Sequence, residues 1–263
     1  MSRGEIFVET KNMIEVITIS NPDKKNALND KILKRLSEEA ARASKKAIRV
    51  LIIKGAGDSA FCSGYDISEI PEDVFISDVE AYEKSPFNRT LNLFEEFPYA
   101  TIAYMNGHTF GGGLELSVCC DIRIAVKGAK MGMTPAKLGL IYSHTGLQKF
   151  INLIGVAKTK ELFYAANPIS SEEAERIGLV NHAVERKDAE NFVMEMAKAI
   201  AENAPISIKG MKTVISKCLM HQNVSYKEYE DILKLRNEAF LSSDFKEGQA
   251  AFLAKRKPIF KGR

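Results

Sequence analysis

Hydrophobic and polar residues alternate along the first twenty positions of the chain. Residues 6–10 and 14–19 each have the alternation of a β-strand, and a polar pair at 11–12 predicts a hairpin between them. Apolar residues then recur at helical spacing after Asn29, a residue type that commonly caps a helix. The run 50–53 is apolar at every position, which predicts a strand buried on both faces.

Two further strands are predicted around a glycine-rich turn, and helical periodicity dominates beyond position 140. The strands are 101–105 and 122–126, with a short apolar helix at 112–119 between them. The later helices are expected at 146–155, 159–166, 171–177 with Ser171 as its cap, 189–200, 205–220, 226–241 and 244–255. The pattern predicts an α/β core over residues 1–200 and a helical C-terminal region over 201–263.

Composition narrows the class of protein. The chain has 263 residues, 45% of them hydrophobic and 27% charged, which is typical of a globular protein. Its apolar runs are far shorter than the ~18 residues of a membrane span, and its first residues do not resemble a secretion signal. A formal net charge of +3 is too small to indicate a nucleic-acid partner. We therefore expect a cytoplasmic protein without a membrane or nucleic-acid partner.

Cysteine and histidine spacing predicts neither disulfides nor a metal site. The four cysteines form no CxxC pair, and the four histidines have no HxH or i, i+4 spacing. The sequence also lacks the GxSxG elbow of an α/β-hydrolase and the GxxxxGK[ST] loop of a P-loop enzyme. Any chemistry must therefore come from other segments.

Two glycine-containing segments are candidates for that chemistry. In segment 60–67, Gly64 suggests a close approach to the backbone, where the Tyr65 N–H could point, although a simple tight turn explains the segment equally well. In segment 106–116, three glycines open an apolar helix and leave its first N–H groups accessible to an anionic oxygen. A purely structural turn remains the alternative there. Glu115 lies one turn into this apolar helix, where a carboxylate needs a partner or a function.

Together the segments resemble the crotonase (enoyl-CoA hydratase/isomerase) superfamily over nearly the whole chain. The markers are the segments 26–28, 61–67, 106–115, 168–171, 178–180, 247–248 and 252–258. The resemblance implies an α/β fold of the ClpP-like type, a spiral of ββα turns with a helical C-terminal region for trimerisation. It also implies a homotrimer or a hexamer, and an acyl-CoA substrate of the kind handled in fatty acid metabolism.

The same resemblance assigns site residues. It implies an oxyanion hole made by the backbone N–H groups of Tyr65 and Gly112, which hold the thioester oxygen. It implies no separate cofactor, because coenzyme A is part of the substrate. The residues that would line the CoA site are Lys24, Lys25, Ala27, Ser63, Asp66, Ile67, Phe252 and Lys255.

Departures from the hydratase pattern bear on which reaction is catalysed. A typical hydratase uses two glutamates; Glu115 matches the first, but the second position is Ala136. Segments 133–142 and 161–169 instead resemble the family's (methyl)malonyl-CoA decarboxylases, which are lyases. In those enzymes a tyrosine at the position of Tyr142 orients the departing carboxylate, and a histidine stands at the position of Tyr65.

The expectation is therefore a decarboxylase-like enzyme with Tyr65, Gly112, Glu115 and Tyr142 at its catalytic site. Decarboxylation needs an enolate sink and an oriented carboxylate, but no base that removes a carbon-bound proton. An enoyl-CoA hydratase or isomerase that works with Glu115 alone is the first alternative. A CoA- or RNA-binding member with little catalysis is a more remote one.

Overall fold

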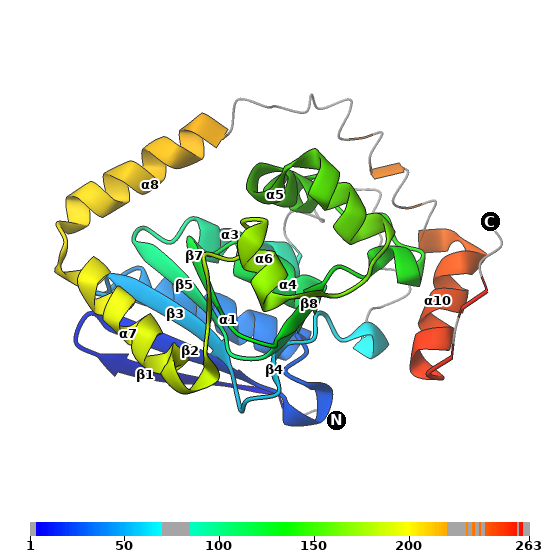
Figure 1. Ribbon diagram of the computed structural model, residues 1–263, viewed down its shortest axis with the longest axis horizontal. Coiled ribbons are helices and arrows are strands. Elements are labelled where there is room, and N and C mark those ends of the chain that lie inside the picture. The colour runs from blue at the N-terminus through cyan, green and yellow to red at the C-terminus, as the bar shows by residue number, and fades with distance from the viewer. Residues whose placement is uncertain are drawn as a thin grey trace.

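The structure is a computed structural model that describes residues 4–69, 85–219, 230, 233–234, 237, 240–256 and 258–259. Most of the helix expected at 226–241 lies outside the described residues, as does the side chain of Cys218. The described part forms a mixed α/β fold built on two sheets (Figure 1).

The larger sheet has six strands whose order in space follows their order in the chain. Its first two strands form the predicted antiparallel hairpin, and the other neighbours pair in parallel. The strands are β1 (Glu5–Lys11), β2 (Ile14–Ser20), β3 (Val50–Gly55), β5 (Ala100–Met105), β7 (Ile122–Val126) and β10 (His182–Val184).

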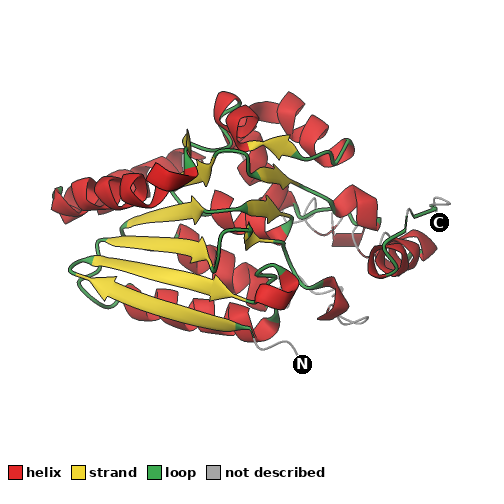
Figure 2. Ribbon diagram, turned by 60° about the horizontal axis from the view of Figure 1, so that its bottom comes forward, coloured by secondary structure: helices red, strands yellow, loops and turns green. Residues whose placement is uncertain are grey.

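The smaller sheet lies beyond the ends of these strands, as Figure 2 shows. Its strands are β4 (Ala60–Cys62), β6 (His108–Phe110), β8 (Lys130–Gly132) and β9 (Ile169–Ser170). Three successive strand pairs therefore divide between the sheets before the chain enters helical structure. The first strand of each pair joins the larger sheet and the second joins the smaller one, in β3–β4, β5–β6 and β7–β8. This is the ββα spiral that the resemblance to the crotonase superfamily implies.

Helices cover both faces of the larger sheet because its central strands are apolar on both faces. In β3, Leu51 and Ile53 belong to one core cluster, which includes residues of helices α1 (Asp30–Ala43) and α3 (Pro86–Glu95). Val50 and Ile52 belong to a second cluster, which includes residues of helix α7 (Arg186–Glu202). The helical elements are η1 (Pro22–Lys24), α1 (Asp30–Ala43), η2 (Ile67–Glu69), α3 (Pro86–Glu95), α4 (Gly112–Val118), η3 (Pro135–Leu138), α5 (His144–Tyr164), α6 (Ser171–Arg176), α7 (Arg186–Glu202), α8 (Pro205–Leu219) and α10 (Ser243–Leu253).

Several local expectations are corrected. The hairpin turn lies at 12–13, with Asn12 at a φ of 57°. The two helices expected at 146–155 and 159–166 are confirmed within α5, where Gly155, with a φ of 70° and a ψ of 168°, interrupts the helical backbone. The cap of α6 is Ser170, because its hydroxyl accepts from the Glu173 N–H at 3.2 Å. The three-residue strands β4, β6 and β8 were not predicted, because so short a run has no measurable period.

The last elements are helical and lie outside the sheets. α8 extends away from the body of the molecule in Figure 1, and α10 lies on the opposite side. The proposed boundary at residue 200 falls inside α7 and stays a prediction. None of the helices in the described ranges is long and apolar enough to cross a membrane.

Candidate active site

The Tyr65 peptide lies in the loop after β4, beside the segment that enters α1. The Leu28 N–H donates to the Gly64 carbonyl at 2.8 Å, and the Asp66 N–H donates to the Leu28 carbonyl at 2.7 Å. Tyr65 is thus the middle residue of an isolated parallel bridge to Leu28. Because carbonyl and N–H point oppositely in a trans peptide, the Tyr65 N–H faces away from Leu28. The phenol hydroxyl donates to Asp30 Oδ1 at 2.7 Å, which directs the side chain toward the start of α1.

The glycine turn before α4 presents the second backbone donor. Gly111 has a φ of 51° and a ψ of −125°, which a residue with a side chain rarely adopts, and its N–H donates to the Gly132 carbonyl at 3.0 Å. Gly112 is the first residue of α4. The first N–H groups of a helix have no acceptor within it and lie at the positive end of its dipole. The Gly112 N–H is therefore placed to bind an anionic oxygen.

The two backbone donors are neighbours in space. Gly64 has a φ of 105°, and a Cβ added to it would lie 3.4 Å from the Gly112 nitrogen. A Cβ added to Gly112 would lie 3.5 Å from the Tyr65 nitrogen. Two N–H donors aimed at one point are the arrangement that stabilises an oxygen in which negative charge develops. The structure thus brings together the two residues that the sequence proposed for an oxyanion hole.

Phe87 adds an apolar wall that sequence reasoning missed. A Cβ added to Gly112 would lie 3.0 Å from the Phe87 Cζ, and the rings of Phe87 and Tyr65 meet edge to face with centroids 6.2 Å apart. Phe87 sits in the first turn of α3, which Ser85 caps. The only signal in the sequence was an aromatic residue next to a proline, and that pattern does not indicate a site.

Glu115 and Tyr142 form a polar pair beside the glycine turn. Glu115 is 2% exposed and lies one turn after Gly112 on α4, so the two residues share a helix face. The Tyr142 hydroxyl donates a hydrogen bond to Glu115 Oε2. A Cβ added to Gly146, in the first turn of α5, would lie 2.7 Å from Glu115 Oε1. The positive end of the α5 dipole therefore also faces this carboxylate.

Ala136 offers no second carboxylate at this site. It lies in η3 and is exposed. Its methyl group cannot donate or accept a proton. Among the candidate residues, Glu115 and Tyr142 are the pair of hydrogen-bonded side chains that can carry a proton beside the glycine turn.

The candidate CoA residues come from two segments that lie side by side. The Ser63 hydroxyl donates to the Lys24 carbonyl at 2.8 Å, and the Ser63 N–H donates to the Lys25 carbonyl at 3.1 Å. Lys24 Nζ lies 3.3 Å from Asp66 Oδ2. Ala27 is buried within the same turn. The structure therefore gathers five of the eight residues, with two lysines that can meet an anionic group.

The other three candidates lie toward the C-terminal helix. Gln249 Nε2 of α10 donates to the Ile67 carbonyl at 3.3 Å, so α10 reaches η2, the cyan turn in Figure 1. Phe252 is 58% exposed, and Lys255 is also exposed. The structure places these two side chains at the surface, and their role in CoA binding stays a prediction.

Neighbouring groups lower the pKa of the Asp66 carboxyl. Burial raises the pKa of Asp66, but hydrogen bonds from the Ser68 hydroxyl and N–H together with the Lys24 ammonium outweigh it, and the pKa lies below its ordinary value. A carboxyl whose pKa is lower in the folded state stabilises the fold above its unfolded pKa of about 3.9. That contribution is lost as the pH falls through the folded pKa.

Replacing this carboxylate should lower stability at neutral pH. We expect Asp66→Asn to reduce the free energy of unfolding by about 1 kcal/mol at pH 7, because Lys24 is partly solvated and Ser68 loses a charged acceptor. The difference from wild type should shrink below about pH 4. Urea unfolding at pH 7 and pH 3.5 measures it, with exposed Asp23→Asn as the control. A deficit that stays constant or grows at low pH contradicts this assignment.

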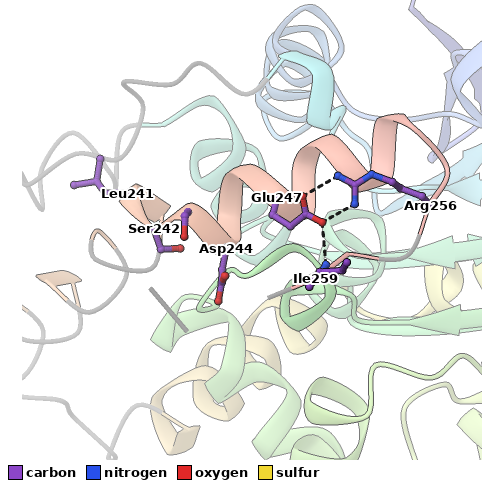
Figure 3. Close-up of a pocket in the computed structure, with 7 residues that line it drawn as sticks. Leu241, Ser242, Asp244, Glu247, Arg256 and Ile259 are labelled. Carbon is purple, nitrogen blue, oxygen red and sulfur yellow. Dashed lines mark hydrogen bonds and ion pairs between the residues drawn. The ribbon is translucent and has the colours of Figure 1, made fainter. Parts of the chain in front are cut away.

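A cavity of about 790 Å³ lies at the C-terminal helix rather than at the glycine turn. Figure 3 shows Glu247 of α10 paired with Arg256, at 2.5 and 2.8 Å, and accepting from the Ile259 N–H. Neither Tyr65 nor Gly112 lines this cavity. Among the described residues, no group of His, Cys, Asp and Glu side chains could hold a metal ion. We therefore place the candidate site at the two backbone donors, because the Glu115–Tyr142 pair lies beside them.

Comparison with known proteins identifies the family. The family model of enoyl-CoA hydratase/isomerase matches residues 9–263. The chain belongs to the enoyl-CoA hydratase/isomerase family. As a member of that family it is a crotonase-type acyl-CoA enzyme, and the expected fold class is confirmed.

Members of the enoyl-CoA hydratase/isomerase family with different reactions resemble this chain. It is 31% identical to methylmalonyl-CoA decarboxylase of Escherichia coli (strain K12), with both chains covered completely. It is 38% identical to a probable enoyl-CoA hydratase of Bacillus subtilis (strain 168), covering 98% of each chain. The crystal structure of methylmalonyl-CoA decarboxylase complexed with 2S-carboxypropyl CoA superposes with a TM-score of 0.92 at 31% identity, with both chains fully covered. These similarities do not separate decarboxylation from hydration.

Proposed function

We propose that this protein decarboxylates a malonyl-type CoA thioester. The observation that supports the proposal is the position of the Tyr142 hydroxyl, which lies on Glu115 one helical turn from the Gly112 N–H. The exposed Ala136, which cannot act as a second acid or base, adds to it. The relative whose crystal structure holds 2S-carboxypropyl CoA has the same fold over the whole chain.

The geometry suits decarboxylation in three steps. The N–H groups of Tyr65 and Gly112 donate to the thioester oxygen, and the Tyr142 hydroxyl, which donates to Glu115 in the unliganded protein, turns to donate to the substrate carboxylate. When the carboxylate is held out of the thioester plane, its bond to the α-carbon breaks and carbon dioxide leaves. The electron pair then forms an enolate whose oxygen the two N–H groups stabilise, and the α-carbon finally takes up one proton from water, which leaves hydroxide. No base is required for the bond that breaks.

Hydration by Glu115 alone is a second candidate. The carboxylate of Glu115 already accepts the Tyr142 hydroxyl, so it has the geometry of a proton acceptor near the thioester. For decarboxylation, the substrate carboxylate would have to share this hydroxyl with the Glu115 carboxylate. Two negative charges would then lie close together, and their repulsion disfavours that arrangement. Relatives named as enoyl-CoA hydratases occur at similar identity.

One paired assay distinguishes the two candidates. Release of carbon dioxide from malonyl-CoA and methylmalonyl-CoA is measured alongside hydration of crotonyl-CoA by the same preparation. The proposal expects carbon dioxide release to dominate. Efficient hydration without carbon dioxide release would refute decarboxylation and establish the second candidate.

Tyr142→Phe should lower the rate of decarboxylation by about 10- to 100-fold. The variant removes one hydrogen bond to a charged carboxylate, which is typically worth about 1.5–3 kcal/mol. The ring still packs against Phe163, whose centroid lies 5.4 Å away, so the fold is expected to persist. Turnover of the paired substrates measures the change, and Tyr164→Phe, at an exposed position, is the control. Unchanged turnover would remove Tyr142 from the mechanism.

We also infer that the protein assembles with copies of itself, as a trimer or a dimer of trimers. Five apolar side chains of α8 are more than half exposed in the single chain. Exposed apolar residues gathered on one helix are typical of a protein–protein contact. They are Ile206, Met211, Val214, Ile215 and Leu219.

A further inference from the structure

We propose that Cys62 is a positioning residue that sets the separation of the two oxyanion donors. The inference rests on the proposed function of Tyr65 and Gly112 as a pair that polarises a thioester. Cys62 is the last residue of β4 and is fully buried, so its side chain does not reach a bound substrate. It contacts both backbone segments that present the donors.

The first contact is with the segment that presents Tyr65. The Gly64 N–H donates to Cys62 Sγ at 3.4 Å, and the thiol faces the Gly64 carbonyl at 3.8 Å. This carbonyl belongs to the same peptide plane as the Tyr65 N–H. Because a peptide is planar, a side chain that holds one end of the plane also orients the other.

The second contact is with the helix that presents Gly112. A Cβ added to Gly113 would lie 2.6 Å from the Cys62 Cβ and 2.7 Å from its Sγ. The Gly113 backbone therefore packs directly on the Cys62 side chain. Gly113 follows Gly112 in the chain, so the Cys62 side chain also packs against the first turn of α4.

Cys62 thus acts as a spacer between the two donor segments. Its side chain has the size needed to contact both Gly64 and Gly113. Burial raises the pKa of its thiol to about 12, so the sulfur stays neutral and accepts the Gly64 N–H without adding a charge beneath the hole. A smaller side chain would leave a void between β4 and α4, and the backbone would relax into it. The donors would then move relative to each other.

The same chain provides a matched control in Cys120. Cys120 is also buried, and its pKa is also raised to about 12. It lies just beyond the other end of α4, where its thiol donates to the Leu116 carbonyl at 3.6 Å. Truncating either cysteine creates a similar void, but only the void at Cys62 lies between the donors.

The test measures thioester polarisation directly. The probe is propionyl-CoA labelled with ¹³C at its thioester carbonyl, which has no carboxylate to lose, and infrared difference spectroscopy records the carbonyl stretch when bound. We expect wild type and Cys120→Ala to lower the stretching frequency equally, and Cys62→Ala to lose at least half of that shift. With the assigned substrate, kcat for Cys62→Ala should fall 10- to 100-fold while KM changes less than threefold.

The possible failures are distinguishable. If wild type itself shows no shift, the oxyanion hole fails, and the proposed function fails with it. A full shift in Cys62→Ala, or an equal loss in Cys120→Ala, overturns the positioning role while leaving the hole intact. Should Cys62→Ala not fold, Cys62→Ser provides the same comparison, because it keeps a smaller acceptor for the Gly64 N–H and should lose part of the shift.

Discussion

Gly112→Pro should lower kcat by about 10²- to 10³-fold relative to Gly112→Ala. Proline removes the N–H that we assign to the thioester oxygen, and the loss of one such donor typically costs about 3–4 kcal/mol of transition-state stabilisation. Gly112 is the first residue of α4, the position at which a helix best tolerates proline. The loss should therefore appear in turnover and not in folding.

Gly112→Ala is the matched control because it adds the same Cβ but retains the N–H. That Cβ would lie 3.0 Å from the Phe87 Cζ, so the ring must move by a few tenths of an ångström in both variants. Steady-state kinetics and thermal unfolding of the pair measure the effect. Equal turnover in the two variants would show that the Gly112 N–H does not act on the reacting oxygen.

Gly146→Ala is expected to reduce kcat by about 10²-fold without lowering stability by a comparable amount. An added Cβ would lie 2.7 Å from Glu115 Oε1 and 2.6 Å from the Tyr142 Cε1, both closer than ordinary van der Waals contact. These flexible side chains must move by several tenths of an ångström, and misplacement of about 1 Å can cost about 10²-fold in rate. Alanine in a helix gains up to about 1 kcal/mol in intrinsic propensity, which offsets part of the strain.

Gly210→Ala separates the general effect of the substitution from the local one. Gly210 lies in α8, and a Cβ added there would meet nothing within 4 Å. Gly210 shares a helix face with Ile206 and Val214, so size-exclusion chromatography first verifies that the variant keeps the wild-type assembly. With that assembly intact, this control should gain about 0.5–1 kcal/mol of stability with unchanged turnover. Turnover and urea unfolding of both variants provide the comparison. Normal turnover in Gly146→Ala would mean that the Glu115–Tyr142 pair is not used in catalysis.

Much of the fold was predictable because local periodicity is a property of the chain alone. The hairpin, the buried strand β3 and the helix capped by Asn29 each appear in the structure close to where the pattern places them. The smaller sheet was not predictable from the residues themselves, because strands of two or three residues have too few positions for a period. The break within α5 was predictable, because Gly155 has no side chain and adopts the positive φ of 70° at which the helical backbone is interrupted.

Residue types and their spacing along the chain are enough to indicate the family, the glycine turn with its backbone donors, and the absence of a carboxylate at position 136. These are matters of residue type and local conformation, which a chain specifies over a few positions. Three contacts become visible once the chain is folded: the peptides of Tyr65 and Gly112 lie side by side, the Tyr142 hydroxyl donates to Glu115, and Cys62 lies between the donor segments. The physical reason is that these contacts join separate turns of the spiral, and their separation depends on packing within the whole core.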